Sequence, residues 1–580
     1  MRKIYILLLL LHGCSSEKEK DISTKFDFET RFERSQGKET ATYRETITYY
    51  EALAKKYPEI NLQTIGETDS GKPLHLITLN PDGEFNFNRI RAIKRVLLIN
   101  NGIHPGESDG IDATMMLFRD MAEGEISLPK STVICTIPIY NVGGSLNRNS
   151  TTRTNQNGPE AYGFRGNARN FDLNRDFIKS DTKNARTFAE IFHLVKPDVF
   201  IDNHVSNGAD YQYTLTHLLT QHNKLGGELG DYLQTEMMPK LEDKLSEKSW
   251  DITPYVNVFN TVPEEGFSQF MDSPRYSTGY TTLWNTLGMM VETHMLKPYK
   301  QRVEGTYELM KSMIEIIEDD GKNISELRKG ANGKFNKNGI YPIQWEVDTT
   351  QNTKLDFMGY EGEMVKSKIT GTKRLKYNPQ KPFNKKVTYQ NYFIPSLEVE
   401  IPDAYIIPQG WWRVIDLLKL NQIEMSPIER DTILNVETYK IKSYKTRKQP
   451  YEGHYSHYDV EIVASRDEHK FRKGDVMVKT DQPGMRYLLE TLEPQAVDSF
   501  FIWNFFDSVL QQKEGFSPYV WEDKAAALLE RDENLKTQFE DKKKNDSDFA
   551  NNWYAQLDWL HKQSENYERA HLQYPVYRLN

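Results

Sequence analysis

Two side chains able to bind a metal ion lie three residues apart in the segment RVLLINNGIHPGESDG, residues 95–110. The four apolar residues from Val96 to Ile99 predict a buried parallel strand, which the polar and glycine residues after it would end. Such a strand carries His104 and Glu107 into a loop at its carboxyl end, where ligands bind in open α/β sheets. Because a histidine and a carboxylate at this spacing can reach one small cation, we predict a divalent metal site.

The other parts of a hydrolytic metal site stand at the ends of two later strands. DVFIDN predicts a strand that ends at His204, and LGMMVE predicts one that ends at Glu292. Zinc hydrolases hold the metal with three protein ligands, two histidines and a glutamate being one such set, and leave the fourth position to water. His104, Glu107 and His204 would complete the set, and Glu292 outside it would serve as general base.

Positive charge for the substrate comes from a long polar segment and the motif that follows it. Residues 140–172 show almost no regular pattern, and a loop of that length in a compact domain is more often functional than idle. In NFDLNRDF, the planar guanidinium of Arg175 beside Asn174 suits a substrate carboxylate. The long segment contains four arginines that could stabilise an oxyanion: Arg148, Arg153, Arg165 and Arg169.

The elements that must position these residues alternate between helix and strand. The two earliest strands, joined by ETDSGKP, have the pattern of a hairpin at the edge of a sheet. The order as a whole favours an α/β fold with a mixed, mostly parallel sheet and helices on both faces. Helices are expected near 43–57, 111–121, 181–195 and 303–320, and strands near 62–65, 74–79, 96–99, 132–140, 198–203 and 287–292.

Composition divides the remainder of the chain, since 580 residues are too many for one ordinary domain. The polar, glycine-rich stretch 321–339 is the best candidate boundary, so the first domain is expected to span 26–325. Short alternating apolar runs favour a β-rich accessory domain over 340–480, as a small sandwich or barrel, followed by a helical region over 487–580.

The N-terminus MRKIYILLLLLHGC has the form of a secretory signal with a lipoprotein-type cleavage site. We expect residues 1–13 to be a signal peptide, Cys14 to carry the lipid and residues 14–25 to be a polar tether, so that the protein is anchored in the bacterial envelope, at the outer membrane. Cys135 then remains alone, which excludes a disulfide framework. A formal net charge of −9 argues against nucleic acid as a partner.

Taken in chain order, these motifs resemble those of the zinc carboxypeptidase family, the metallocarboxypeptidases similar to pancreatic carboxypeptidase A. The resemblance extends over roughly 42–320: a leading helix ending in ALAKKYP, then IGETDSGKPLHLI, GIHPGE, DLNRDF, the strand that ends at His204, and MMVETH. What it implies for the fold is the mixed sheet described above.

For the site, the resemblance implies that the three ligand candidates bind Zn²⁺ and that Glu292 is general base and acid. It also implies that Asn174 and Arg175 bind the terminal carboxylate of the substrate. The oxyanion arginine would be Arg153, preferred over Arg165. The tyrosine that caps bound substrate would be Tyr280, with Tyr276 as the other candidate.

The function implied is that of an exported zinc exopeptidase that removes C-terminal residues from peptides or proteins. Three alternatives stay open: a peptidoglycan stem-peptide hydrolase, an acyl-amino-acid hydrolase of the aspartoacylase group, and a non-catalytic envelope protein that keeps the fold for binding. The leading helix, the hairpin and the position of VETH favour the peptidase. The intact ligand set together with Glu292 argues against a non-catalytic protein.

Overall fold

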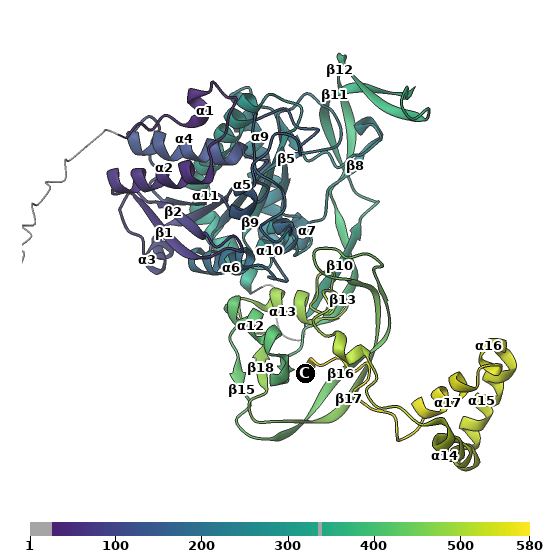
Figure 1. Cartoon of the computed structure of the whole chain (residues 1–580). Coiled ribbons are helices and arrows are strands. Elements are labelled where there is room, and N and C mark those ends of the chain that lie inside the picture. The colour runs from purple at the N-terminus through teal and green to yellow at the C-terminus, as the bar shows by residue number, and fades with distance from the viewer. Residues whose placement is uncertain (1–25, 334–338) are drawn as a thin grey trace, which may run out of the picture.

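The computed structural model describes residues 26–333 and 339–580 (Figure 1). The predicted signal peptide, the lipidation site Cys14 and the tether up to residue 25 lie outside the described residues. Within the described part of the chain, no helix is both long enough and apolar enough to cross a membrane.

An eight-stranded sheet forms the centre of the N-terminal unit, residues 26–333, in the order β1-β2-β4-β3-β5-β9-β6-β7. The neighbours β4, β3, β5 and β9 run parallel, whereas β1 and β2 pair antiparallel at the edge, as the hairpin pattern predicts. The predicted fold class, a mixed and mostly parallel sheet, is therefore confirmed. The strands are β1 Ile60–Glu67, β2 Pro73–Leu79, β3 Arg95–Asn100, β4 Thr132–Ile137, β5 Val199–Ser206, β6 Leu215–Leu219, β7 Ile252–Pro254 and β9 Leu287–His294.

Helices cover both faces of this sheet because successive strand residues point to opposite sides. In β3, Val96 and Leu98 enter one hydrophobic core, and Leu97 and Ile99 enter the other. One face is covered by α3 Phe87–Ile93, α6 Lys183–Val195 and α10 Ser277–Thr282; the other by α2 Tyr43–Lys56, α4 Asp109–Glu123, α8 Gly227–Tyr232, α9 Met238–Glu247 and α11 Tyr299–Asn332. Short helices α1 Arg31–Arg34, α5 Val142–Leu146 and α7 His222–Leu225 lie in the connections.

The last helix of the unit is longer than the sequence predicts. We expected it to end near Asp320, but α11 continues to Asn332. Its additional turns pack on the sheet: Ile324 is fully buried, and Arg328 pairs with Asp198 at 2.5 Å. The polar, glycine-rich composition of 321–332 therefore concealed a helix, and the predicted helix end near Asp320 is wrong.

Beyond residue 339 the chain is rich in strands, as expected, but they do not close into one barrel. The long hairpin β11–β12 returns to the N-terminal unit, where β12 pairs with β8 (Figure 1). A separate six-stranded sheet has the open order β15-β18-β14-β19-β16-β17. The strands are β8 Phe267–Ser268, β10 Ile340–Val347, β11 Thr353–Lys366, β12 Lys373–Gln390, β13 Phe393–Glu400, β14 Ala404–Ile407, β15 Ser426–Pro427, β16 Thr432–Thr446, β17 His457–Phe471, β18 Val476–Lys479 and β19 Tyr577–Leu579.

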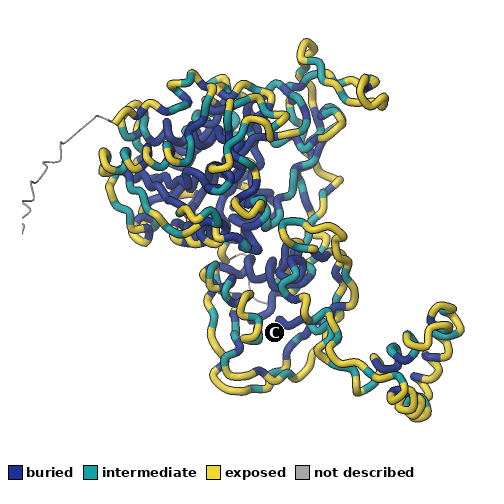
Figure 2. Tube along the Cα trace, viewed as in Figure 1, coloured by how far each residue is buried: buried dark blue, intermediate teal, exposed yellow. Residues whose placement is uncertain are grey.

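The C-terminal helices fall into two groups. The first, α12 Trp412–Leu420 and α13 Met485–Leu492, shares the large core that also lies under the first sheet. The second group projects away from the six-stranded sheet with a small core of its own, and much of its surface is exposed (Figures 1 and 2). It consists of α14 Pro518–Arg531, α15 Glu533–Asn545, α16 Ser547–Ala550 and α17 Trp553–Lys562. The region 487–580, expected to be helical, is thus helical over about half of its length, and its last strand, β19, returns between β14 and β16.

The N-terminal unit and the second unit, residues 339–580, are joined by a continuous interior. Trp284 of the N-terminal unit stacks on Tyr487 of α13 with ring centroids 5.7 Å apart. Arg486, next to Tyr487, donates to the carbonyl of Lys224 at 2.7 Å. Because this contact is buried and specific, the second unit has a fixed position relative to the first sheet.

Candidate active site and metal centre

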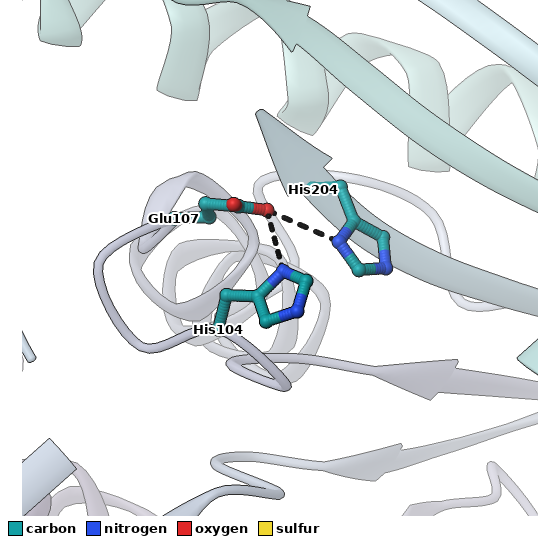
Figure 3. Close-up of side chains that lie close together, drawn as sticks. All are labelled: His104, Glu107 and His204. Carbon is teal, nitrogen blue, oxygen red and sulfur yellow. Dashed lines mark hydrogen bonds and ion pairs between the residues drawn. The ribbon is translucent and has the colours of Figure 1, made fainter. Parts of the chain in front are cut away.

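The three predicted metal ligands lie together at the carboxyl edge of the first sheet. His104 and Glu107 are in the loop between β3 and α4, and His204 is on the neighbouring strand β5. Nδ1 of His104 and Nδ1 of His204 lie 3.2 and 3.1 Å from Oε2 of Glu107 (Figure 3). All three side chains are buried, and one ligand atom from each lies within 4.8 Å of the others. This arrangement can hold one small cation.

The opposite nitrogen of each imidazole faces a carboxylate. Nε2 of His104 lies 3.0 Å from Oδ1 of Asp172, and Nε2 of His204 lies 3.0 Å from Oδ2 of Asp202. Metal-binding histidines commonly have such partners, which fix the tautomer and leave the other nitrogen for the metal. We did not predict either aspartate. Asp202 precedes His204 by two residues on a strand, so the period-two pattern could have identified it.

The electrostatics of the cluster suit a cation. Burial by itself raises the pKa of Glu107, but the Arg153 guanidinium and His104 outweigh burial and keep that pKa well below its ordinary value. Burial lowers the pKa of His204, yet Asp202 more than compensates and raises it well above the usual range. A cation bound in the cluster would stabilise the Glu107 carboxylate as Arg153 and His104 do, and it would replace the proton on the His204 nitrogen that faces Glu107.

Glu292 stands beside the cluster in position to move a proton. Strand β9 is the parallel neighbour of β5, and their register places Glu292 level with His204. Burial raises the pKa of Glu292 to about 7. Within the described residues no hydrogen bond or ion pair holds its carboxylate. A carboxyl group with this pKa can accept and release a proton near neutrality.

A cavity of about 250 Å³ connects these groups. Its charged lining consists of the three ligand candidates with Glu292, Arg165 and Arg175. The remaining lining is uncharged: Asn174, Val205, Asn207, Leu218, Tyr255, Asn257, Phe259, Phe270, Tyr276 and Met290. The cavity is thus polar at one part of its wall and otherwise mainly apolar and aromatic.

Asn174 and Arg175 form a short 3₁₀ helix, Leu173–Arg175, on the wall of this cavity. Asp172 caps the helix by accepting from the backbone N–H of Asn174 at 2.9 Å. The guanidinium of Arg175 lies over the ring of Tyr276 at 4.4 Å, and its Nη1 donates to the carbonyl of Asn174 at 2.7 Å. A half-buried guanidinium so supported can bind a carboxylate that enters the cavity.

The two candidate oxyanion arginines have different surroundings in the structure. Nη2 of Arg153 donates to Oε1 of Glu107 at 2.7 Å, and Arg153 does not line the cavity. Arg165 does line it, held by Asp172 through two hydrogen bonds of 3.0 and 2.8 Å. Arg153 is therefore better suited to support the ligand Glu107, and Arg165 to face an oxyanion.

Tyr280, the first candidate for the tyrosine that caps bound substrate, does not line the cavity. Tyr280 lies in α10, is buried, and donates its hydroxyl hydrogen to Oδ1 of Asn421 at 2.6 Å. Tyr276, the N-cap of the same helix, lines the cavity instead. The helix is too short for its apolar face to be recognised from sequence, so nothing in SPRYSTGY distinguished the two tyrosines.

Comparison with known proteins supports the relationship that the motifs indicate. No family model matches the chain. Carboxypeptidase 2 of Trichophyton rubrum is 21% identical over 427 residues, which span 69% of this chain and 72% of that protein. The predicted resemblance to carboxypeptidases is confirmed.

Solved structures similar to this chain include a metallo-carboxypeptidase from Burkholderia cenocepacia and carboxypeptidase A from Helicoverpa armigera. The first is 17% identical, with a TM-score of 0.37 and coverage of 48% of this chain and 70% of that chain. The second is 12% identical, with a TM-score of 0.37 and coverage of 49% and 74%.

Proposed function

We propose that this chain is an exported zinc metallocarboxypeptidase that hydrolyses the C-terminal peptide bond of peptides or proteins. One observation carries the proposal: a single cavity contains the buried cluster of three ligand candidates, the carboxylate of Glu292 and the guanidinium of Arg175. A metal hydrolase needs the first two features, and an exopeptidase specific for a free C-terminus needs the third.

The donor set fits zinc. Two imidazole nitrogens and one carboxylate are ligands that catalytic zinc takes, and three protein ligands leave a fourth position open. Asp172 and Asp202 fit the same use, because each occupies the nitrogen of its histidine that a metal would not need. Zinc bound there would polarise the scissile carbonyl and lower the pKa of a water molecule.

The protein's own residues would then divide the work. Arg175 and Asn174 bind the terminal carboxylate and thereby fix which peptide bond lies over the ligand cluster. Glu292 accepts a proton from the attacking water and later delivers it to the leaving amine. Arg165 donates hydrogen bonds to the oxyanion that develops on the scissile carbonyl.

The lining also indicates the preferred substrate. All charged residues of the cavity have roles in this scheme, and the side chains left for the terminal residue include Leu218, Phe270 and Met290. We therefore propose that apolar and aromatic C-terminal residues are preferred. In a peptide library analysed by mass spectrometry, release of such residues should exceed release of Lys, Arg, Asp and Glu.

Paired substrates test the proposed reaction. A peptide with a free C-terminus should be cleaved at its last bond, and the same peptide with a C-terminal amide should be cleaved much more slowly. Losing a partner of a desolvated charge pair costs about 2–5 kcal/mol, or about 30- to 4,000-fold in kcat/KM. Equal cleavage of acid and amide, or cuts within the peptide, would replace this function with a wall endopeptidase or an acyl-amino-acid hydrolase.

We further propose that the enzyme acts in the bacterial envelope, anchored through a lipid on Cys14. The support is the sequence at the N-terminus, in which a charged start and a short apolar run precede Gly13 and Cys14. Peptides or proteins are the expected partners, and nucleic acid is not.

A further inference from the structure

One loop of the second unit contacts the segment that carries the substrate-binding arginine. The loop 447–456 joins β16 to β17. Within it, the hydroxyl of Tyr451 accepts a hydrogen bond from Nε of Arg175 at 2.8 Å. Oε2 of Glu452 accepts from the backbone N–H of Asp172 at 2.8 Å. The second unit thus reaches a functional arginine directly, through a side chain far away in the sequence.

The loop is anchored beyond these two contacts. Nε2 of His454 lies 2.7 Å from Oδ2 of Asp181, a residue of the N-terminal unit in the same segment as Arg175. Gly453 stands against the ring of Phe171, where a Cβ atom would lie 3.0 Å from the ring carbons. The loop therefore holds the segment 171–181 at both ends.

The tyrosine itself is held in place by its own unit. Its ring stacks on Trp503 with centroids 6.2 Å apart and an interplanar angle of 18°. Trp503 is fully buried and donates from Nε1 to Oδ1 of Asp498 at 3.2 Å. The same carboxylate accepts from Nε of Arg275 in the N-terminal unit at 2.8 Å. A buried stack thus determines where the Tyr451 hydroxyl lies.

These contacts fix the orientation of the Arg175 guanidinium. Nε is bound by Tyr451, Nη1 donates to the carbonyl of Asn174, and the ring of Tyr276 lies under the guanidinium plane. Within the described residues, Nη2 has no hydrogen-bond partner. A planar guanidinium bound on one edge and supported on one face can present its remaining donors to a carboxylate without losing further rotational freedom.

From this geometry we infer that Tyr451 is a positioning residue, through which the second unit takes part in recognising the substrate's free carboxylate. The inference rests on the proposed carboxypeptidase function. The second unit is then part of the specificity apparatus of the enzyme and more than an attached module.

The test removes only the hydroxyl. Tyr451→Phe in the full-length, zinc-loaded chain keeps the ring stacked on Trp503. We expect KM for the free-acid peptide to rise about tenfold, the lower end of what losing one hydrogen bond to a charged group costs. We expect kcat to change less than about twofold, and zinc content and melting temperature to stay at wild-type values. Tyr455→Phe, which alters an exposed tyrosine of the same loop, is the matched control and should leave KM unchanged.

A binding measurement gives a second readout that does not depend on slow amide cleavage. L-Phenylalanine, a product of the expected type, should inhibit Tyr451→Phe about tenfold more weakly than wild type, whereas L-phenylalaninamide should inhibit both equally. If the acid and amide forms weaken equally, or if neither changes, Tyr451 does not position Arg175. If wild-type enzyme itself fails to discriminate acid from amide, the proposed function fails first, and the inference fails with it.

Discussion

Replacing Asp202 with Asn should weaken the metal site without disturbing the fold. Asp202 is fully buried, with Oδ2 facing Nε2 of His204 and Oδ1 accepting from Nδ2 of Asn100 at 3.0 Å. Asn has the same shape as Asp, so packing is kept. If its oxygen continues to accept from Asn100, its NH₂ group faces His204, and Nε2 of that histidine must then become an acceptor.

The Asp202→Asn change would also alter the protonation of Nδ1, the other ring nitrogen of His204. A neutral imidazole carries one proton, so an acceptor Nε2 places that proton on Nδ1, the atom that faces Glu107. Zinc could then bind Nδ1 only if that proton left or moved to Nε2, where it would face the NH₂ group of the new asparagine. Changes to such partners of metal-binding histidines typically cost about 10- to 100-fold in metal affinity, which corresponds to about 1.4–2.7 kcal/mol.

Competition with a calibrated chelator measures the zinc affinity of Asp202→Asn and wild type. Asp210→Asn is the control, because Asp210 also lies 3.1 Å from Nε2 of a histidine, His294, which is not one of the ligand candidates. We expect a lower affinity only for Asp202→Asn, with activity restored at saturating zinc to the extent that the ion binds. Wild-type zinc affinity in a folded Asp202→Asn protein would refute the role assigned to His204 and its partner.

Four further outcomes are expected. Glu292→Gln should retain stoichiometric zinc by elemental analysis while kcat falls about 10²- to 10⁴-fold, the usual contribution of proton transfer. The base must be ionised, and burial raises the pKa of Glu292 to about 7, a value that a bound cation would lower. kcat/KM should therefore fall as the pH drops through an apparent pKa at or below that value, and a flat profile over the whole acid range in which the protein stays folded would contradict this. Cys14→Ser should move the protein from the membrane fraction to the soluble fraction of the cell envelope, whereas continued sedimentation with membranes would exclude the lipid anchor. In that variant Cys135 is the last thiol, and because burial raises its pKa to about 12, it should react with a disulfide reagent at pH 8 only after unfolding.

That the ligand candidates lie together could be predicted because each follows a short apolar run. Buried parallel strands are recognisable from such runs, and their carboxyl ends meet at one edge of the sheet. His104 and Glu107 follow β3, and His204 and Glu292 stand near the ends of β5 and β9, which are neighbours. The sequence did not show that these strands are neighbours. The expectation that all their carboxyl ends lie at the same edge of one sheet was sufficient to predict that the four side chains are close together.

The residues on irregular backbone could not be predicted in the same way. Arg153 and Arg165 lie in a loop without periodicity, so nothing in the sequence orients one toward Glu107 and the other into the cavity. The extension of α11 was missed for the opposite reason. Its last turns have polar and glycine residues, yet the buried Ile324 and the ion pair of Arg328 hold them in a helix. In the loop and in the last turns of α11, tertiary contacts that the local sequence does not show determine the structure.

The contact of Tyr451 with Arg175 could not be predicted from any local sequence pattern. Tyr451 is 276 residues from Arg175, and its own neighbours in the sequence have no recognisable motif. Its position follows from the shared interior of the two units, in which Trp284 stacks on Tyr487 and Tyr280 bonds to Asn421. Because that interior fixes one unit against the other, a loop tip can hold a guanidinium at hydrogen-bond distance. Tyr280, through its hydrogen bond to Asn421, thus helps to hold together the two units whose contact brings Tyr451 to Arg175.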